Sequence, residues 1–253
     1  MAILQCNPIA NKITLELQEY IKNNRVIKRL AIIYEGKENG QQSYIKNIIR
    51  YCNIYNIKYD LWNVKESNLN KDDIFAINQL YDSIMCVKPF NKVTAKLLKD
   101  SISIKKDIDD FTDQSDFMSC TAEGVLSILK HYNISTVQNH IVIIGRGEGD
   151  KVCNLLSNKI HNATVSKIHS KTSKTMVSKL LSIADVIISA TGCKDTLNIN
   201  NIPSNSKKII IDIGRGDVGN KLYNYDNLKI TPKINGTGLI TTQILMKHII
   251  KGQ

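Results

Sequence analysis

Residues 140–150 read HIVIIGRGEGD, and this stretch decides the fold. Its apolar run, 141–144, is too short for a helix and rich in β-branched residues, which is typical of a buried parallel strand. After a glycine-rich turn, a helical stretch over 152–160 and a second strand over 163–168 complete a βαβ unit. Such a turn places backbone N–H groups and a helix N-terminus where a pyrophosphate can bind. The sequence therefore predicts a dinucleotide site.

The residues around this turn bear on which dinucleotide binds. Asp150 stands where the third glycine of G-x-G-x-x-G would be, so a tight turn with solvated basic residues is the alternative reading. The second strand ends in HSKT (169–172), where an NAD site usually carries a carboxylate for the ribose hydroxyls. A hydroxyl and an ammonium there, with Arg146 in the turn, favour a 2′-phosphate and hence NADP. The predicted cofactor-binding residues here are Gly145, Arg146, Gly147, Ser170 and Lys171.

Composition narrows the class of protein. At 253 residues and 42% hydrophobic, the chain can form one large domain or two modest ones with ample core. It has no apolar run of about 18 residues, so no membrane span is expected, and its first residues do not resemble a signal peptide. The six cysteines are scattered and never form C-x-x-C. We expect free thiols in a reducing compartment, with neither a metal site nor disulfides.

The net charge of +11 comes from 34 Lys and Arg residues against 23 Asp and Glu residues, and we expect most of the basic residues to form a solvated surface. The lysines are dispersed among many Ile and Asn residues, and no basic run is interleaved with aromatic residues. No nucleic-acid-binding module is evident, so nucleic acid is not an expected partner. We expect the excess positive charge to favour binding of an anionic small substrate or cofactor instead.

Apolar patterning along the chain alternates between strands and helices. Strands separated by helices of 10 to 15 residues indicate parallel pairing and an α/β fold. The segments 191–193 and 214–216 follow two further strands, so they should meet the 145–147 turn at one edge of the sheet, where open α/β sheets bind ligands. Thr191, Gly192 and Arg215 are therefore further cofactor-binding candidates. The expected helices cover 8–22, 42–55, 71–80, 93–102, 122–132, 176–183 and 239–250, and the other expected strands 30–34, 57–64, 83–87, 185–190 and 209–213.

Six ordered segments between about residues 30 and 250 resemble the methylenetetrahydrofolate dehydrogenase/cyclohydrolase family. KDIDDF (106–111) is similar to its K-D-V-D-G-[FL], and SCTAEG (119–124) to its P-C-T-P-x-G. ATVSKIHSKT (163–172) is very similar to its A-T-V-T-x-x-H-S-[RK]-T. The remaining matches are Gly145 to Gly147 with G-R-S, Asp212 to Gly214 with D-V-G, and Thr231, Pro232, Gly236, Gly238 and Thr241 with parts of T-P-V-P-G-G-V-G-P-M-T.

The resemblance implies a two-domain α/β protein with a cleft between the domains. Residues 1–120 and 239–253 would form a folate-binding domain that includes the last helix, and residues 121–238 a Rossmann-type NADP-binding domain. The family oxidises 5,10-methylenetetrahydrofolate with NAD(P)+, often hydrolyses the methenyl product, and commonly dimerises through an edge of the Rossmann domain. A cytoplasmic homodimer is the expectation that follows. The segment matched near the C-terminus adds Gly236, Gly238 and Thr241 to the cofactor-binding candidates.

Two departures fall on the family's catalytic positions. The family pairs Tyr with Lys four residues later on one helix, so that both side chains reach the same side. Here Tyr44 is present, but the vacated Lys position is Ile48, and Lys46 points roughly the opposite way. The Gln of the family's Q-L-P-L-P, which supports that Lys, is Val87. Asp109, which in the family hydrogen-bonds the pterin ring, is retained.

These losses affect the family's two reactions unequally. Hydride transfer mainly requires two rings to be held face to face, because the protein removes no proton in that step. Hydrolysis of the methenyl carbon needs a polarising cation or acid, worth about 10² to 10⁴ in rate. The sequence therefore predicts an oxidoreductase, an NADP-dependent methylenetetrahydrofolate dehydrogenase with weak or absent cyclohydrolase activity.

Two other readings remain open at this point. In the first, the chain is a catalytically silent folate- or nucleotide-binding relative with a regulatory or assembly role, which is favoured by Asp110 and Asn235 where the family has glycine. In the second, it is a bifunctional enzyme that uses Lys88 in place of the missing lysine. Several candidates also have simpler readings: Tyr44 as a half-buried helix aromatic, Asp109 as a turn cap, and Lys88 and Arg215 as exposed side chains.

Overall fold

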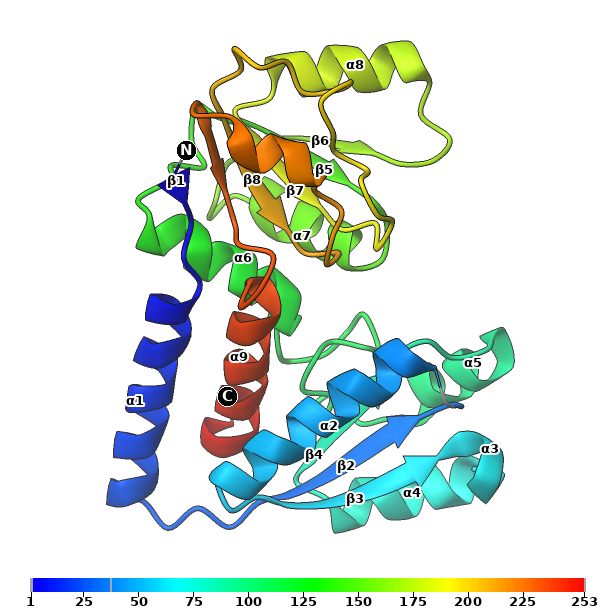
Figure 1. Cartoon of the computed structure of the whole chain (residues 1–253). Coiled ribbons are helices and arrows are strands. Elements are labelled where there is room, and N and C mark those ends of the chain that lie inside the picture. The colour runs from blue at the N-terminus through cyan, green and yellow to red at the C-terminus, as the bar shows by residue number, and fades with distance from the viewer. Residues whose placement is uncertain (1, 37, 253) are drawn as a thin grey trace. The chain divides into compact units, whose positions relative to one another are not determined.

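The structure is a computed structural model that describes residues 2–36 and 38–252. The chain divides into two compact units (Figure 1): unit 1, residues 2–11 and 121–241, and unit 2, residues 12–120 and 242–252. The division falls within α1 (Asn7–Asn23) and α9 (Thr237–Lys251). The sequence placed all of 1–120 in one domain, whereas residues 2–11 belong to unit 1. The reason is a strand too short to recognise: β1 (Ala2–Ile3) pairs with β9.

Unit 1 is built on a parallel sheet. Within the described residues it has six strands in the order β1-β9-β8-β7-β5-β6. Each pairing is parallel, and the two outermost positions are held by β1 and β6. The remaining strands are β5 (His140–Ile144), β6 (Thr164–Ile168), β7 (Val186–Ser189), β8 (Lys208–Asp212) and β9 (Leu228–Ile230). The sheet is of the Rossmann type that the sequence predicts.

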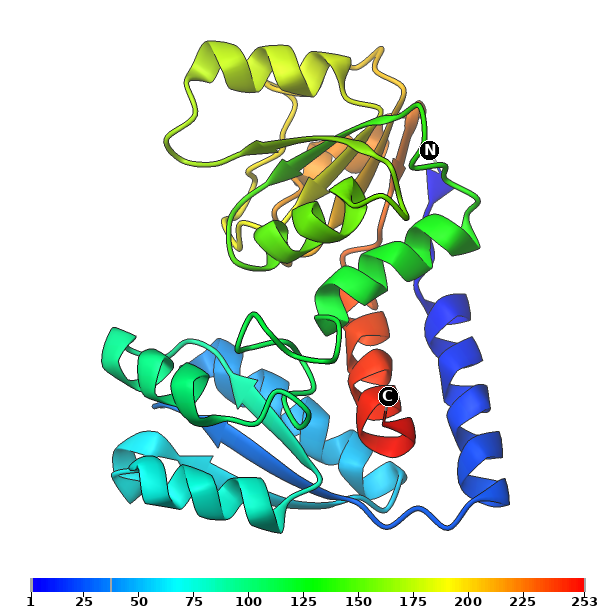
Figure 2. The same ribbon diagram turned by 180° about the vertical axis from the view of Figure 1, so that it is seen from behind.

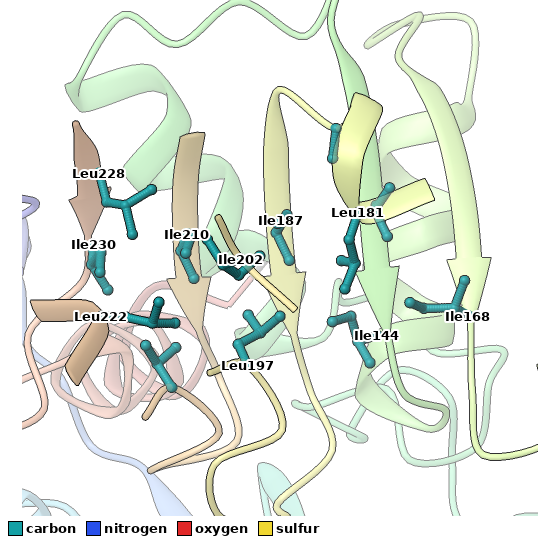
Figure 3. Packing of buried hydrophobic residues seen from close by; sticks show 13 residues of the cluster. Ile144, Ile168, Leu181, Ile187, Leu197, Ile202, Ile210, Leu222, Leu228 and Ile230 are labelled. Atoms are coloured by element: carbon teal, nitrogen blue, oxygen red, sulfur yellow. The ribbon is translucent and has the colours of Figure 1, made fainter. Parts of the chain in front are cut away.

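Successive residues of β5 face opposite sides of this sheet. Val142 and Ile144 pack with Leu181 of α8 (Lys174–Ile183) in the buried cluster shown in Figure 3. On the other side, Ile143 lies against Gly149 of α7 (Glu148–Ser157). Figures 1 and 2 show α8 and α7 on opposite sides of the sheet. The all-apolar run 141–144 is therefore buried on both faces, as expected of a central parallel strand.

Two further elements complete unit 1. The helix α6 (Cys120–His131) leads into β5, and the short 3-10 helix η1 (Asn220–Asn224) precedes β9. In α7 the helix starts four residues before the predicted stretch at 152, because its first turn is polar and carries no apolar pattern. Asp150 Oδ2 accepts a hydrogen bond from the Gly147 N–H at 2.9 Å, which pairs an amide at the start of that turn.

Unit 2 carries a second parallel sheet. Within its described residues it has three strands in the order β3-β2-β4. On one side of this sheet, β2 and β4 pack with α4 and α5 in one cluster of buried residues. The helix α2 buries Gln41, Ile45, Ile48, Tyr51 and Cys52 and contacts both β3 and β4. The elements are β2 (Arg29–Tyr34), α2 (Asn39–Ile54), β3 (Lys58–Asn63), α3 (Val64–Ser67), α4 (Lys71–Leu80), β4 (Ser83–Val87) and α5 (Lys92–Ser101).

Local sequence signals fix where these helices begin. Asn70 accepts hydrogen bonds from the backbone of residues 72 and 73 at the start of α4, and Asn91 does the same for residues 93 and 94 at α5. Asparagine is a preferred residue at this position because its side-chain oxygen pairs amides that have no helical partner. Among the described residues, we find no helix that has both the length and the apolar character needed to span a membrane.

Candidate functional site

A cavity of about 570 Å³ opens at the carboxyl ends of β5, β6 and β7 in unit 1. Its apolar wall comes from strand ends and from α8, and its polar residues come from the turns that follow the strands. This combination of an apolar body and a few placed polar groups is typical of a small-molecule site. The lining residues are Ile144, Gly145, Arg146, Ile168, His169, Ser170, Val177, Leu181, Ala190, Thr191, Cys193, Thr196 and Asn201.

The glycine at position 145 is required by the geometry of the turn. Gly145 has a φ of +115°, and a Cβ there would lie 2.4 Å from the carbonyl oxygen of Ala190. Only glycine fits both the backbone angle and the close approach of the two strand ends. The turn thus holds the start of α7 next to the cavity.

Polar groups that could discriminate between dinucleotides meet at one side of the cavity. Arg146 Nη2 lies 3.4 Å from His169 Nδ1, and Ser170 lines the same cavity. The backbone N–H of Lys171 donates to His169 Nδ1 at 3.2 Å, which shapes the strand end. Lys171 itself is exposed and does not line the cavity. The Arg146 guanidinium and the Ser170 hydroxyl are thus the two candidate groups that line the same cavity.

Thr191 is tied to a buried carboxylate. Asp217 is fully buried, and its Oδ2 accepts hydrogen bonds from the Thr191 N–H at 2.7 Å, the Thr191 hydroxyl at 2.8 Å and the Ser189 hydroxyl at 2.6 Å. These bonds fix the end of β7 at the cavity wall. Gly192, by contrast, is exposed, has a φ of +65° and does not line the cavity.

The other cofactor-binding candidates gather at the end of β8. A Cβ on Gly238 would lie 3.2 Å from Arg215 Nη2, so the exposed Arg215 lies against this glycine. The Thr241 hydroxyl donates to the Gly238 carbonyl at 3.1 Å. At Gly236 a Cβ would meet the carbonyl oxygen of Pro232 at 2.5 Å, so the loop before α9 folds tightly. This group is separate from the residues that line the cavity.

In unit 2, the residues at the predicted catalytic positions lie on α2 and β4. Tyr44 is half-buried, whereas Ile48 is fully buried with 0% exposure. Val87, at the last position of β4, is 2% exposed and equally apolar. Lys88 follows it and is exposed. The positions four residues after Tyr44 and at the end of β4 therefore carry no polar side chain.

The loop that carries Asp109 is organised by a buried carboxylate. Asp107 is 2% exposed and accepts hydrogen bonds from the Phe111 N–H at 2.9 Å, the Thr112 N–H at 2.8 Å and the Thr112 hydroxyl at 2.7 Å. Half-buried Asp109 then accepts a hydrogen bond from the Cys120 N–H at 2.7 Å. This bond orients the Asp109 carboxylate and pairs an amide at the start of α6.

Two replacements of family glycines keep a glycine-like backbone. Asp110 has a φ of +51° and Asn235 a φ of +55°. Aspartate and asparagine are the residues other than glycine that adopt this left-handed conformation most readily. Asp110 Oδ1 also accepts a hydrogen bond from the Ser115 N–H at 3.2 Å. Both loops therefore retain the backbone path that a glycine would allow.

Three further polar residues near the predicted positions were not among the sequence candidates. Thr196 and Asn201 line the cavity from an irregular segment that has no strand or helix pattern to locate it. Gln41 is 4% exposed and reaches the end of β4. Its only sequence signal is its position three residues before Tyr44, which places both on one helix face.

Comparison with known proteins accords with this geometry. Residues 119–253 match the family model described as tetrahydrofolate dehydrogenase/cyclohydrolase, NAD(P)-binding domain. The bifunctional protein FolD of Clostridium botulinum strain Langeland is 30% identical, covering 98% of this chain and 96% of that protein. Both units are therefore represented in a single curated relative.

Solved structures extend the similarity to the whole fold. The bifunctional enzyme FolD from Campylobacter jejuni, a methylenetetrahydrofolate dehydrogenase/cyclohydrolase, matches with a TM-score of 0.83 and 27% identity, covering 99% of this chain and 98% of that one. A Trypanosoma brucei structure of the same enzyme type, complexed with NADP and an inhibitor, shares the fold at a TM-score of 0.81 and 20% identity, covering 96% and 93%. The chain belongs to the tetrahydrofolate dehydrogenase/cyclohydrolase family.

Proposed function

We propose that the chain is an NADP-dependent 5,10-methylenetetrahydrofolate dehydrogenase with weak or absent cyclohydrolase activity. Unit 1 would bind the nicotinamide cofactor, and unit 2 would bind the folate through Tyr44 and Asp109. The observation that supports weak or absent cyclohydrolase activity is that a fully buried isoleucine, Ile48, stands four residues after Tyr44. No ammonium group is available at that position to handle the protons of hydrolysis.

The residues of unit 1 fit a dinucleotide. The cavity volume suits an adenine and its ribose, and the turn has open space at Gly147, where a Cβ would meet nothing within 4 Å, for a pyrophosphate. Arg146 and Ser170 would bind a 2′-phosphate, the group by which NADP differs from NAD. The group at the end of β8, with Arg215, Gly236, Gly238 and Thr241, would contact the rest of the cofactor. When bound, the cofactor supplies a hydride acceptor.

The residues of unit 2 would position rather than activate the substrate. The Asp109 carboxylate, held by the Cys120 amide, would accept hydrogen bonds from the pterin ring. Tyr44 would pack beside the carbon that loses its hydride. That step releases no proton to the protein, so it does not require a base at position 48 or 87. Hydrolysis of the methenyl product does require proton transfer. Loss of the group that transfers the proton lowers the rate of hydrolysis by a factor of about 10² to 10⁴.

A catalytically silent role is less well supported. The replaced glycines, Asp110 and Asn235, keep a positive φ, so both loops retain their backbone path.

Use of Lys88 as a catalytic lysine is tested by Lys88→Met: if hydrolysis of methenyltetrahydrofolate by the wild-type chain depends on Lys88, this variant loses it. The dehydrogenase assay itself measures reduction of NADP with methylenetetrahydrofolate. No reduction would overturn the proposal.

We also infer a cytoplasmic homodimer that binds neither nucleic acid nor membranes. The six described cysteines are free thiols, four of them buried, and burial raises the pKa of Cys6 and of Cys52 to about 12. Such unreactive thiols suit a reducing compartment. The strand β6 stands at one end of the sheet order, hydrogen-bonded to β5, so its other edge is available to a second copy. Light scattering tests the dimer; a monomer mass would contradict it.

A further inference from the structure

A buried amide lies at the end of β4, one helical turn before Tyr44. Gln41 of α2 is 4% exposed. Its Nε2 donates to the Val87 carbonyl at 2.8 Å and lies 3.4 Å from the Pro89 carbonyl. Because both neighbours are carbonyl oxygens, which only accept, the NH₂ end of the amide must face them. The orientation of Gln41 is therefore fixed, with Oε1 directed away from β4.

That oxygen has no hydrogen-bond partner among residues 2–36 and 38–252. A buried carbonyl without a donor destabilises the folded chain, and the large majority of buried polar atoms in proteins are paired. Of the four such atoms among the described residues, Gln41 Oε1 is the one in unit 2, and it can accept from a donor that the chain itself does not provide. Its neighbour Gln42 is half-buried, donates to the Gly36 carbonyl at 3.3 Å, and does not have a buried oxygen without a partner.

Gln41 lies next to the position of the lost catalytic amide, at the end of β4. Val87, to which Gln41 donates, is the position where the family resemblance places a glutamine. Gln41, Tyr44 and Ile48 are spaced i, i+3 and i+7, so they lie along one face of α2. The chain has thus lost an amide from the strand and carries one at the same strand end from the helix.

The surroundings of β4 bring the pterin-binding candidate close to the same place. Burial raises the pKa of the Cys86 thiol, the residue before Val87, and the charges of Asp107 and Asp109 raise it further, while the charge of Lys88 lowers it. Asp109 and Lys88 are therefore near enough to the end of β4 to influence Cys86 electrostatically. The Asp109 carboxylate and the Gln41 amide therefore both lie near the end of β4 in unit 2.

We propose that Gln41 is a folate-binding residue, whose Oε1 accepts a hydrogen bond from a ring N–H of the reduced pteridine. The identity of the ligand rests on the proposed function. A reduced pteridine carries several N–H donors, and Asp109 satisfies some of them. Gln41 supplies a second, neutral acceptor and takes over the place of the amide that Val87 lacks. It orients the ring without supplying a proton, which is consistent with a dehydrogenase.

The first test compares two matched variants, Gln41→Met and Gln42→Met. Both remove an amide from α2 that donates to a backbone carbonyl, but only the first removes the unpaired buried oxygen. We expect Gln41→Met to raise the KM for methylenetetrahydrofolate about tenfold, with the KM for NADP within about twofold of wild type. Gln42→Met should leave both KM values unchanged. An unchanged folate KM in Gln41→Met, or equal rises in both KM values, would overturn the proposal.

The second test moves the amide back to the strand. In Gln41→Ala combined with Val87→Gln, the amide returns to the family position and the lost volume is partly restored. We expect this double variant to recover most of the folate affinity that Gln41→Ala alone loses, which a purely structural bond between α2 and β4 would not produce. If the double variant does not fold, as judged by its melting temperature, the methionine pair decides the question.

Binding of tetrahydrofolate, measured by calorimetry, separates this inference from the proposed function. If wild-type chain binds tetrahydrofolate about tenfold more tightly than Gln41→Met but reduces no NADP, the dehydrogenase assignment fails and the role of Gln41 stands. If wild type reduces NADP and Gln41→Met binds tetrahydrofolate equally well, the role of Gln41 fails and the dehydrogenase assignment stands.

Discussion

Asp109 Oδ1 accepts a hydrogen bond of 2.7 Å from the backbone N–H of Cys120, so the start of α6 holds a carboxylate that the proposed function assigns to the pterin ring. The bond links two segments that the sequence places in separate motifs. It also gives Asp109 two separable roles: pairing a helix amide and binding substrate.

The two roles predict different outcomes for two variants. Asp109→Asn keeps an oxygen for the Cys120 N–H, so it should fold with near-normal stability but raise the folate KM about 10- to 100-fold through loss of a charge-assisted bond. Asp109→Ala should raise the folate KM at least as much and also lower the free energy of unfolding by about 1 to 2 kcal/mol. Steady-state kinetics and urea denaturation measure both. A normal folate KM in Asp109→Asn would remove the residue from the site.

Ile48→Lys tests why cyclohydrolase activity would be missing. We expect this variant to hydrolyse methenyltetrahydrofolate faster than wild type, because it restores an amine four residues after Tyr44. Its stability should fall, since Ile48 is fully buried and a lysine must be accommodated there. Ile45→Lys, also on α2 at a buried position but off the catalytic spacing, is the control. Equal hydrolysis in both variants would mean that more of the site has been lost than one amine.

Cofactor choice should depend on Arg146. Arg146→Ala is expected to raise the KM for NADP about tenfold or more while changing the KM for NAD much less, because a guanidinium–phosphate contact is lost. Ser170→Ala should act in the same direction with a smaller effect. Lys174, exposed in the first turn of α8 and outside the cavity, provides a control by Lys174→Ala. Equal losses for both cofactors would assign Arg146 to another part of the dinucleotide.

Two glycines of one turn should respond differently to alanine. In Gly145→Ala the new Cβ would lie 2.4 Å from the Ala190 carbonyl oxygen at a φ of +115°, so we expect a loss of about 3 kcal/mol or more in unfolding free energy. A Cβ in Gly147→Ala meets nothing within 4 Å, but the φ of +66° and ψ of −106° suit only glycine, so a smaller loss of about 1 to 3 kcal/mol is expected. Thermal unfolding of both variants checks this order, and the reverse order would contradict the turn geometry.

A buried carboxylate at the end of β8 gives stability a pH dependence. Burial raises the pKa of Asp212 above 3.8, and the charge of Asp217 raises it further, partly offset by hydrogen bonds from backbone amides. The folded chain thus holds a proton there more tightly than the unfolded chain, so the free energy of unfolding falls as pH rises from 3.8 through the folded-state pKa. Urea denaturation at about pH 4 and about pH 7 should show a smaller fall in Asp212→Asn than in wild type. Asp116→Asn, exposed in unit 2, should retain the wild-type fall.

Long apolar runs made most of the fold predictable. The strands at 83–87 and 141–144, and the helix at 71–80, appear where the sequence places them. The strands it missed are β1, with two residues, and β9, with three, which are too short for a periodic pattern and depend on neighbouring strands for their hydrogen bonds. The assignment of residues 2–11 to unit 1 follows from the first of these.

The sites were predictable only where a motif marks them. The strand ends at Gly145, Ser170 and Thr191 do line one cavity, because parallel neighbouring strands end at the same edge. Gln41 and Asn201 carry no motif, since one reaches a strand end from a helix and the other lines the cavity from an irregular loop. Contacts of this kind depend on tertiary packing and leave no periodic trace in the sequence.

The most direct measurement is a paired assay of the wild-type chain with 5,10-methylenetetrahydrofolate and NADP. It follows both the reduction of NADP and the fate of the methenyl product. We predict substrate-dependent formation of NADPH, a slower reaction with NAD, and accumulation of methenyltetrahydrofolate that converts to 10-formyltetrahydrofolate little faster than in buffer. Absence of NADPH formation, or hydrolysis that keeps pace with oxidation, would contradict it.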